Sequence, residues 1–243
     1  MASGPRMRSG ISCWLRVTSS GSCPASKSTT KGCAQVMAID VCIPWRSQPE
    51  RLPAFKRVKA WYEARGYNVI TADSRKHETF NVAASRNLAV SKATSDVVIV
   101  ADADTIPDET ALSLAVRNPV GVVYPFDRYR YLTTESVGLP ESEWVVEREY
   151  RQSVGGMVVA TRSTYWSLGG QDERFARWGY EDNAFHLAAS TLSTVSRIPG
   201  VVHAFGHEAD RDLSPENPGR SRCQLYRFAE GKPDVMRELI PQR

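Results

Sequence analysis

The feature that most constrains the fold is a continuous apolar run, Val97 to Ala101, that leads directly into Asp102-Ala-Asp104. A run of this length that is rich in β-branched residues predicts a strand buried on both faces of a parallel sheet. Because side chains alternate along a strand, Asp102 and Asp104 are expected to point the same way from its carboxyl end. Binding crevices of open α/β sheets lie at that end. Two like charges there are tolerated best beside a cation, so the pair predicts a metal site.

Strand-like and helix-like patterns alternate along most of the chain. Apolar, β-branched runs predict strands over 36–43, 67–72, 97–101, 120–124, 155–160 and 200–204. Helical spacing of apolar residues predicts helices over 52–65, 81–94, 108–117, 142–151, 163–168 and 181–189. This alternation is typical of an α/β fold with right-handed crossovers. We therefore expect one three-layer α/β/α domain with a mostly parallel central sheet and with long loops, suited to binding, between about 125 and 180.

The beginning of the chain differs in composition from the rest. Residues 1–36 contain five basic and no acidic side chains, which leaves 26 basic against 27 acidic side chains in the remainder. The segment also lacks the apolar core of a secretory signal peptide. We expect residues 1–35 to be a leader or disordered segment and residues 36–243 to form the domain. The near-neutral domain gives no electrostatic support for a nucleic-acid partner.

Cysteine usage and hydropathy predict the setting of the protein. The five cysteines, at positions 13, 23, 33, 42 and 223, match no zinc or redox spacing. An odd number without an export signal predicts free thiols in a reducing, cytoplasmic compartment. No apolar run approaches the ~18 to 20 residues of a membrane span, so we expect no membrane partner.

Other charged residues lie near the predicted carboxyl edge of the sheet. Arg46, Asp73 and Arg86 could together supply cations for phosphates and a carboxylate for a base or a ribose. Either His203 or His207, near the end of the last predicted strand, is a candidate third metal ligand. Carboxylates select hard divalent ions, and an imidazole beside them favours Mn²⁺ over Ca²⁺.

Two acids, Glu181 and Asp182, begin a predicted helix directly after Trp178-Gly-Tyr180. Acids at the amino end of a helix are common, because the helix dipole and the free N–H groups favour them. Two acids next to an aromatic platform indicate more than a cap, however. Sugar rings pack their C–H faces on aromatic rings while their hydroxyls bond to carboxylates, so this segment predicts a sugar site.

Five segments, in order, resemble those of a known enzyme family. They are Ile43-Pro-Trp-Arg46, Phe80-Asn81 to Arg86-Asn87, Asp96 to Pro107, Gly155-Gly156 to Gly169-Gly170 followed by Trp178-Gly-Tyr-Glu-Asp182, and His207 with Pro215-Glu-Asn-Pro218. From about residue 36 to 218 the chain resembles GT-A-fold nucleotide-sugar glycosyltransferases. The similarity is to the β-1,4-galactosyltransferase group and its carboxyl-terminal region, which is related to the polypeptide N-acetylgalactosaminyltransferases.

The resemblance implies a GT-A fold, a hexosyltransferase activity and a role for each matching residue. It implies that nucleotide or donor contacts come from Pro44, Arg46, Asp73, Asn81, Arg86, Asp102, Ala103, Gly156 and Trp178. It implies that Mn²⁺, or Mg²⁺, is held by Asp102, Asp104 and His207, the last preferred over His203. The donor would be a UDP-sugar, with Asp182 as general base and Glu181 bonding donor hydroxyls.

Two departures and several alternatives stay open. The family often has glycine where Tyr180 stands and a further acid where Asn183 stands, which affects the acceptor geometry. Galactosyltransferases imply inversion at the anomeric carbon, whereas the N-acetylgalactosaminyl group retains it. The acceptor could be a glycan, a protein Ser or Thr, a small molecule or a modified DNA base. A nucleotidyltransferase or a non-catalytic sugar-binding module are the alternative functions.

Overall fold

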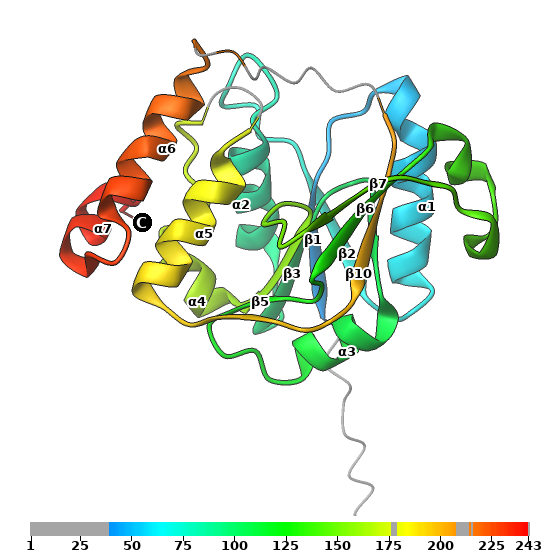
Figure 1. Cartoon of the computed structure of the whole chain (residues 1–243), viewed down its shortest axis with the longest axis horizontal. Coiled ribbons are helices and arrows are strands. Elements are labelled where there is room, and N and C mark those ends of the chain that lie inside the picture. Colours follow the sequence, from blue (N-terminus) through cyan, green and yellow to red (C-terminus); the bar gives the residue numbers. More distant parts are fainter. Residues whose placement is uncertain (1–38, 176–178, 208–213, 215, 243) are drawn as a thin grey trace, which may run out of the picture. The chain divides into compact units, whose positions relative to one another are not determined.

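The computed structural model describes residues 39–175, 179–207, 214 and 216–242 (Figure 1). The predicted leader, residues 1–35, lies outside these ranges, and so do Trp178, residues 208–213 and Pro215. The proposed boundary between leader and domain therefore stays a prediction.

A six-stranded sheet forms the centre, in the order β2-β1-β3-β8-β5-β9. Its strands are β1 (Asp40–Pro44), β2 (Asn68–Ala72), β3 (Val97–Ala101), β5 (Val122–Tyr124), β8 (Met157–Thr161) and β9 (Val195–Arg197). The pairs β1–β2, β1–β3 and β5–β9 are parallel, whereas β8 runs antiparallel to both β3 and β5. The prediction of a mostly parallel sheet is confirmed, with β8 as the exception.

Helices cover both faces of this sheet, as the alternating pattern predicted (Figure 1). They include α1 (Leu52–Glu63), α2 (Val82–Lys92), α3 (Glu109–Arg117), α4 (Arg162–Ser167) and α5 (Glu181–Leu192). The chain crosses from β1 to β2 in one direction and back from β2 to β3 in the other. Right-handed crossovers then place α1 and α2 on opposite faces. Predicted caps are present, since Asp108 accepts a hydrogen bond from the Ala111 N–H at the start of α3.

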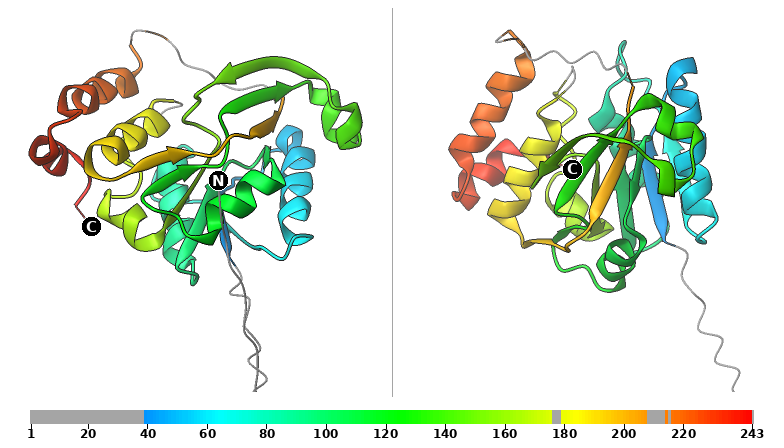
Figure 2. Two further views of the ribbon diagram at one scale, coloured as in Figure 1. Left: turned by 60° about the horizontal axis from the view of Figure 1, so that its bottom comes forward. Right: turned by 45° about the vertical axis from the view of Figure 1, so that its right-hand side comes forward.

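A second sheet of four strands, in the order β4-β10-β6-β7, was not predicted (Figure 2). It consists of β4 (Thr105–Pro107), β6 (Arg128–Leu132), β7 (Val146–Arg151) and β10 (Val201–Phe205). The helix expected over 142–151 is wrong: Glu141–Glu143 forms a short 3₁₀ turn, η3, and β7 follows as the edge strand. All six residues of β7 are exposed, so pairing with β6, and not a buried face, decides their conformation.

Two further helices, α6 (Pro218–Ala229) and α7 (Pro233–Leu239), pack against α5 (Figure 1). They form a second apolar cluster around Phe175, Cys223, Tyr226 and Met236. In the described residues the two cysteines, Cys42 and Cys223, are buried free thiols. None of the described helices has the length and apolar character needed to span a membrane. Short 3₁₀ turns, η1 (Pro49–Arg51) and η2 (Thr134–Gly138), complete the loops near the carboxyl edge.

Candidate active site

A cavity of about 1830 Å³ opens between the two sheets and the start of α5. Most of the predicted site residues line it, namely Pro44, Arg86, Asp102, Ala103, Asp104, Gly156, Glu181, Asp182 and His207. Segments as far apart in the sequence as those of Pro44 and His207 therefore meet at the carboxyl edge. Arg46, Asp73 and Asn81 are not part of this lining.

The two acids after β3 reach the cavity by a different route from the one predicted. The strand ends at Ala101, and residues 102–104 form a turn before β4. A hydrogen bond fixes the turn next to the start of β8, since the Asp102 N–H donates to the carbonyl of Gly156 at 2.9 Å. Both acids line the same cavity, but their carboxylates bind different partners. Both acids therefore lie at the cavity because of this turn, and not because they share one face of a strand as predicted.

Asp104 is bound by the guanidinium of Arg51 and the imidazole of His207. Its Oδ2 accepts hydrogen bonds from Arg51 at 3.0 Å and from His207 Nε2 at 2.9 Å. Burial alone would raise the pKa of Asp104, but the bonds from His207 and Arg51 outweigh it and hold the pKa below its usual value. His203, the alternative ligand, lies against Trp144 with 5.1 Å between ring centroids, and burial lowers its pKa to about 4. The structure thus places His207, and not His203, beside Asp104.

Asp102 and the two acids of α5 surround one buried arginine. The guanidinium of Arg86, on α2, binds Asp102 through Nη2 and binds Asp182 Oδ1 through Nη1 at 2.7 Å. Glu181 Oε1 lies 3.8 Å from the same Nη1. Burial raises the pKa of Asp102 although Arg86 opposes it, and the charges of Asp182 and Asp104 raise it further.

Glu181 is perturbed in the same direction. Burial and the charge of Asp182 raise its pKa, and the Arg86 guanidinium compensates only in part. Its Oε2 is buried and has no hydrogen-bond partner among the described residues. An unpaired buried acceptor at the edge of a cavity is a candidate for binding a ligand hydroxyl.

The backbone before α5 is held in an uncommon conformation. Gly179 and Tyr180 have φ values of 95° and 72°, both in the left-handed region. This region suits glycine and is rare for an aromatic residue. The turn starts the helix at Glu181 and directs Glu181 and Asp182 into the cavity. The glycine usual in the resembled family would fit the same conformation at position 180 without strain.

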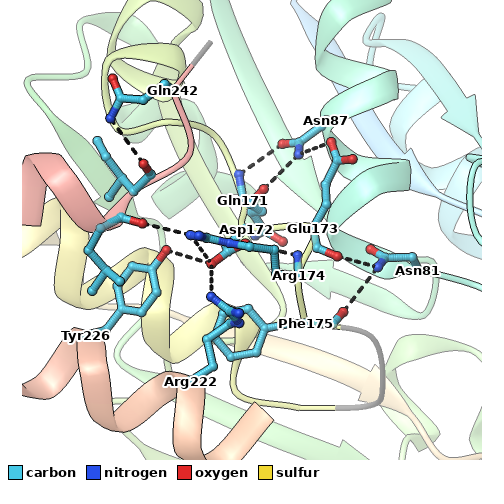
Figure 3. A network of polar contacts seen from close by, with 12 residues as sticks. Asn81, Asn87, Gln171, Asp172, Glu173, Arg174, Phe175, Arg222, Tyr226 and Gln242 are labelled. Atoms are coloured by element: carbon cyan, nitrogen blue, oxygen red, sulfur yellow. Dashed lines mark hydrogen bonds and ion pairs between the residues drawn. The ribbon is translucent and has the colours of Figure 1, made fainter. Parts of the chain in front are cut away.

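A polar clamp fixes the segment 171–175, which precedes this turn (Figure 3). Asn87 accepts from the Gln171 N–H at 2.9 Å and donates to the Gln171 carbonyl at 2.8 Å. Asn81 caps α2 and donates to the carbonyls of Glu173 and Phe175 at 2.9 and 3.2 Å. The amide of Asn81 is thus bonded within the protein, and its predicted nucleotide contact stays a prediction.

Arg46 and Asp73 bind each other beside the cavity. Arg46 Nε and Nη2 donate to the Asp73 carboxylate at 2.9 and 2.8 Å, and these hydrogen bonds lower the pKa of Asp73. The Arg46 guanidinium also lies 5.3 Å from the ring centroid of Phe80, which lines the cavity. The pair is positioned next to the predicted nucleotide region, and its contact with a nucleotide stays a prediction.

One wall of the cavity, and the arginine that binds Asp104, were not among the predicted site residues. Tyr129 and Tyr131 on β6 and Arg148 on β7 line the wall, and Arg148 lies 5.6 Å from the Tyr131 ring centroid. A Cβ on Gly156, where φ is 97°, would lie 2.5 Å from the Tyr129 ring, so glycine is needed for this approach. The alternation of arginine and tyrosine over 128–131 is a period-two signal that could have identified β6. No sequence pattern of this kind indicates that Arg51 lies at the cavity and binds Asp104.

Comparison with known proteins gives one family match and several similar solved structures. Residues 136–205 match the family described as the N-terminal domain of galactosyltransferase. The catalytic domain of Drosophila β1,4-galactosyltransferase 7 in complex with xylobiose is similar in structure, with a TM-score of 0.55, 18% identity, and coverage of 77% of this chain and 79% of that chain. A mutant of that enzyme in complex with manganese, UDP-Gal and xylobiose gives a TM-score of 0.55 and 17% identity over the same shares.

A more distant structure, GalNAc-T7 with UDP, GalNAc and Mn²⁺, has a TM-score of 0.47 and 15% identity, covering 82% of this chain and 45% of that chain. No curated protein sequence matches the chain. The fold is that of GT-A glycosyltransferases, as the sequence predicted. The matched galactosyltransferase domain, which includes Gly155, Gly156, Glu181 and Asp182, supports a glycosyltransferase.

Proposed function

We propose that the protein is a metal-dependent glycosyltransferase that moves a sugar from a UDP-sugar to an acceptor hydroxyl. The observation that carries this proposal is the charge balance of the ion-paired groups in the cavity. Four carboxylates (Asp102, Asp104, Glu181, Asp182) face two guanidinium groups (Arg51, Arg86), so the cluster has two excess negative charges when its acids are ionised and His207 is neutral. A divalent cation is the ligand that balances such an excess.

Asp104 and His207 fit a manganese ion in their donor chemistry. A carboxylate oxygen and an imidazole nitrogen lie 2.9 Å apart on the cavity wall, and both donor types suit Mn²⁺. Among the described residues no three His, Cys, Asp or Glu side chains converge as a ready metal site, because Asp102 is turned toward Arg86. We propose Asp102 as the third ligand or as a ribose contact. When bound, the ion would supply positive charge to the diphosphate of the donor.

The chain's own residues would then carry the chemistry. Asp182 would accept the proton of the acceptor hydroxyl as its oxygen bonds to the anomeric carbon. The bond from that carbon to the diphosphate oxygen breaks in the same step, UDP leaves, and the configuration inverts. The buried Oε2 of Glu181 would accept a hydrogen bond from a donor hydroxyl. Arg46 and Asp73 would contact the nucleotide at the rim.

The acceptor is proposed to be a sugar. The support is the aromatic wall of Tyr129 and Tyr131, with Tyr150 5.8 Å from Tyr131 between ring centroids. The Drosophila galactosyltransferase, whose fold is similar, was solved with xylobiose. A cytoplasmic location, predicted from cysteine usage, stays a prediction.

Calorimetry with UDP-galactose, with and without MnCl₂, tests the proposal. We expect binding that requires the metal, followed by hydrolysis or transfer that mass spectrometry detects over a panel of UDP-sugars with xylobiose as acceptor. Metal-independent binding of the free glycan without nucleotide binding would instead identify a sugar-binding module. Transfer of the nucleotidyl group in place of the sugar would identify a nucleotidyltransferase.

A further inference from the structure

Arg86 links three segments that are distant in the sequence. It extends from α2, and its side chain is 4% exposed. Nη2 binds Asp102, which follows β3. Nη1 binds both Asp182 in the first turn of α5 and the side-chain amide oxygen Oε1 of Gln171, the latter at 2.8 Å. Gln171 is itself fixed by Asn87 (Figure 3). The guanidinium is therefore held on a rigid support.

The carboxylate of Asp182 is bound on one oxygen and open on the other. Oδ1 accepts from Arg86 at 2.7 Å and lies 3.5 Å from Gln171 Nε2. Oδ2 points toward Gly155, where a Cβ would lie 3.0 Å from it. Among the described residues, the Asp182 carboxylate is all that such a Cβ would meet within 4 Å. The absence of a side chain at position 155 thus leaves space in front of Oδ2.

This inference rests on the proposed function and deepens it. We propose that Arg86 is a positioning residue that fixes Oδ1 of Asp182, so that Oδ2 alone receives the acceptor proton through the space at Gly155. The proton passes from the acceptor hydroxyl to Oδ2, the acceptor oxygen bonds to the anomeric carbon, and the diphosphate leaves with the electron pair of the broken bond. Arg86 takes no proton in this step.

The planar fork of arginine is what this role requires. Two of its nitrogens bind carboxylates from different elements at the same time, which a single ammonium group does not reproduce. Lysine at position 86 would keep the positive charge but lose the fixed orientation of Asp182. If Arg86 served only to neutralise buried acids, Arg86→Lys would change turnover little.

A double-mutant cycle tests the coupling of Arg86 to Asp182. Hydrolysis of UDP-sugar with Mn²⁺ is measured for wild type, Arg86→Lys, Asp182→Asn and the double variant, with the UDP-sugar of the panel that wild type turns over fastest. We expect Arg86→Lys to lower kcat at least ~10-fold in wild type and less than ~3-fold when Asp182 is already Asn. Equal losses in both backgrounds would overturn the proposal.

Gly155→Ala tests the space in front of Asp182 Oδ2 without altering a buried residue. Gly138→Ala is its matched control, since a Cβ at Gly138 meets nothing within 4 Å among the described residues. We expect Gly155→Ala to lower kcat at least ~10-fold, with calorimetric binding of UDP and Mn²⁺ within ~3-fold of wild type, and the control to match wild type. Normal turnover by Gly155→Ala would overturn the proposed path of the proton.

The proposed function and the proposed role of Arg86 would be contradicted by different results. If wild type neither binds UDP with Mn²⁺ nor hydrolyses any UDP-sugar, the proposed function is wrong and this inference falls with it. If wild type is active but the cycle shows additive losses, only the role of Arg86 is wrong. Thermal unfolding of each variant separates a positioning effect from misfolding, and Gly155→Ala still decides the question if Arg86→Lys does not fold.

Discussion

Two charged clusters include residues of the segment 171–182, and they differ in whether arginines compensate their acids. The first, the Asp172 cluster, joins one acid to Arg174, Arg222 and Tyr226 (Figure 3). The Asp172 carboxylate accepts from Arg174 at 2.7 and 2.8 Å and from the Tyr226 hydroxyl at 3.0 Å. Burial would raise its pKa, but the bonds from Arg174 and Tyr226 outweigh burial and lower it. This acid is satisfied within the protein.

The second, the Arg86 cluster, joins one arginine to Asp102, Glu181 and Asp182. Here burial raises the pKa of both Asp102 and Glu181, and buried atoms of Arg86 and Glu181 lack partners among the described residues. A buried acid whose charge is compensated by arginines stabilises a fold, whereas a cluster with more acids than arginines at a cavity is a candidate for binding a ligand. The difference predicts that substitutions in the first cluster change stability and that substitutions around the second change binding and turnover.

The largest loss of turnover is expected from substituting Asp104, a proposed metal ligand. Asp104→Ala removes the carboxylate that Arg51 and His207 share. We expect it to lower UDP-sugar turnover on the order of 10³-fold, because the charge that a metal supplies to the leaving group contributes several kcal/mol. Kinetics with saturating MnCl₂ measure it, and Asp234→Ala, an exposed acid on α7, is the control. Wild-type turnover of Asp104→Ala would remove the metal role from this acid.

Asp182→Asn tests the general base within the Arg86 cluster. The amide keeps the shape of the side chain but cannot accept the acceptor proton, so we expect turnover to fall at least ~10²-fold. Donor binding, measured by calorimetry with UDP and Mn²⁺, is expected to persist. Weaker donor binding with unchanged turnover would contradict this assignment and make Asp182 a donor ligand instead. Glu141→Gln, on the exposed turn η3, provides the unaffected control.

Much of the central sheet could be predicted from the sequence, because its strands and helices have strong local periodicities. The strands β1, β2 and β3 and the helices α1, α2 and α3 all occur where the apolar patterns predicted them. The second sheet could not be predicted in full. The edge strand β7 has no buried face, and its conformation is set by pairing with β6, about 20 residues earlier in the chain.

The residues that line the candidate site could be predicted from the sequence, but the hydrogen bonds and ion pairs between them could not. The acids at 102, 104, 181 and 182 and the histidine at 207 belong to motifs that the sequence displays, and all line the cavity. The partners of Arg86 are separated from it by 16 to 96 positions, and no local pattern indicates which acids a buried arginine will bind. For the same reason Arg51, which binds Asp104, was missed.

The Asp172 cluster is tested through stability. Asp172→Asn removes the charge that Arg174 and Tyr226 bind, and we expect a loss of about 2 kcal/mol in the free energy of unfolding. Because the folded pKa of Asp172 is lowered, its contribution is present above the ordinary value of 3.8 and is lost as the pH falls through the folded value. Urea unfolding at neutral and acid pH measures both effects, with Asp234→Asn as the exposed control. Equal stability of Asp172→Asn and wild type at neutral pH would contradict the prediction.

The Arg86 cluster predicts a pH dependence of the opposite sign, and Glu181→Gln tests it. Burial raises the pKa of Glu181 from 4.5 to about 7. The folded state therefore favours the protonated acid, and the stability gained from this preference is present below the ordinary pKa and is lost as the pH rises through the raised one. A glutamine stays neutral, so the stability of Glu181→Gln relative to wild type is expected to increase by at least about 1 kcal/mol between about pH 5 and pH 8. Urea unfolding across this range, without metal or nucleotide, measures the trend. Glu63→Gln, in an exposed pair with Lys59, is expected to show none. If the Glu181→Gln difference stays constant with pH, the carboxylate is already neutralised within the protein, and the two clusters do not differ in the way proposed here.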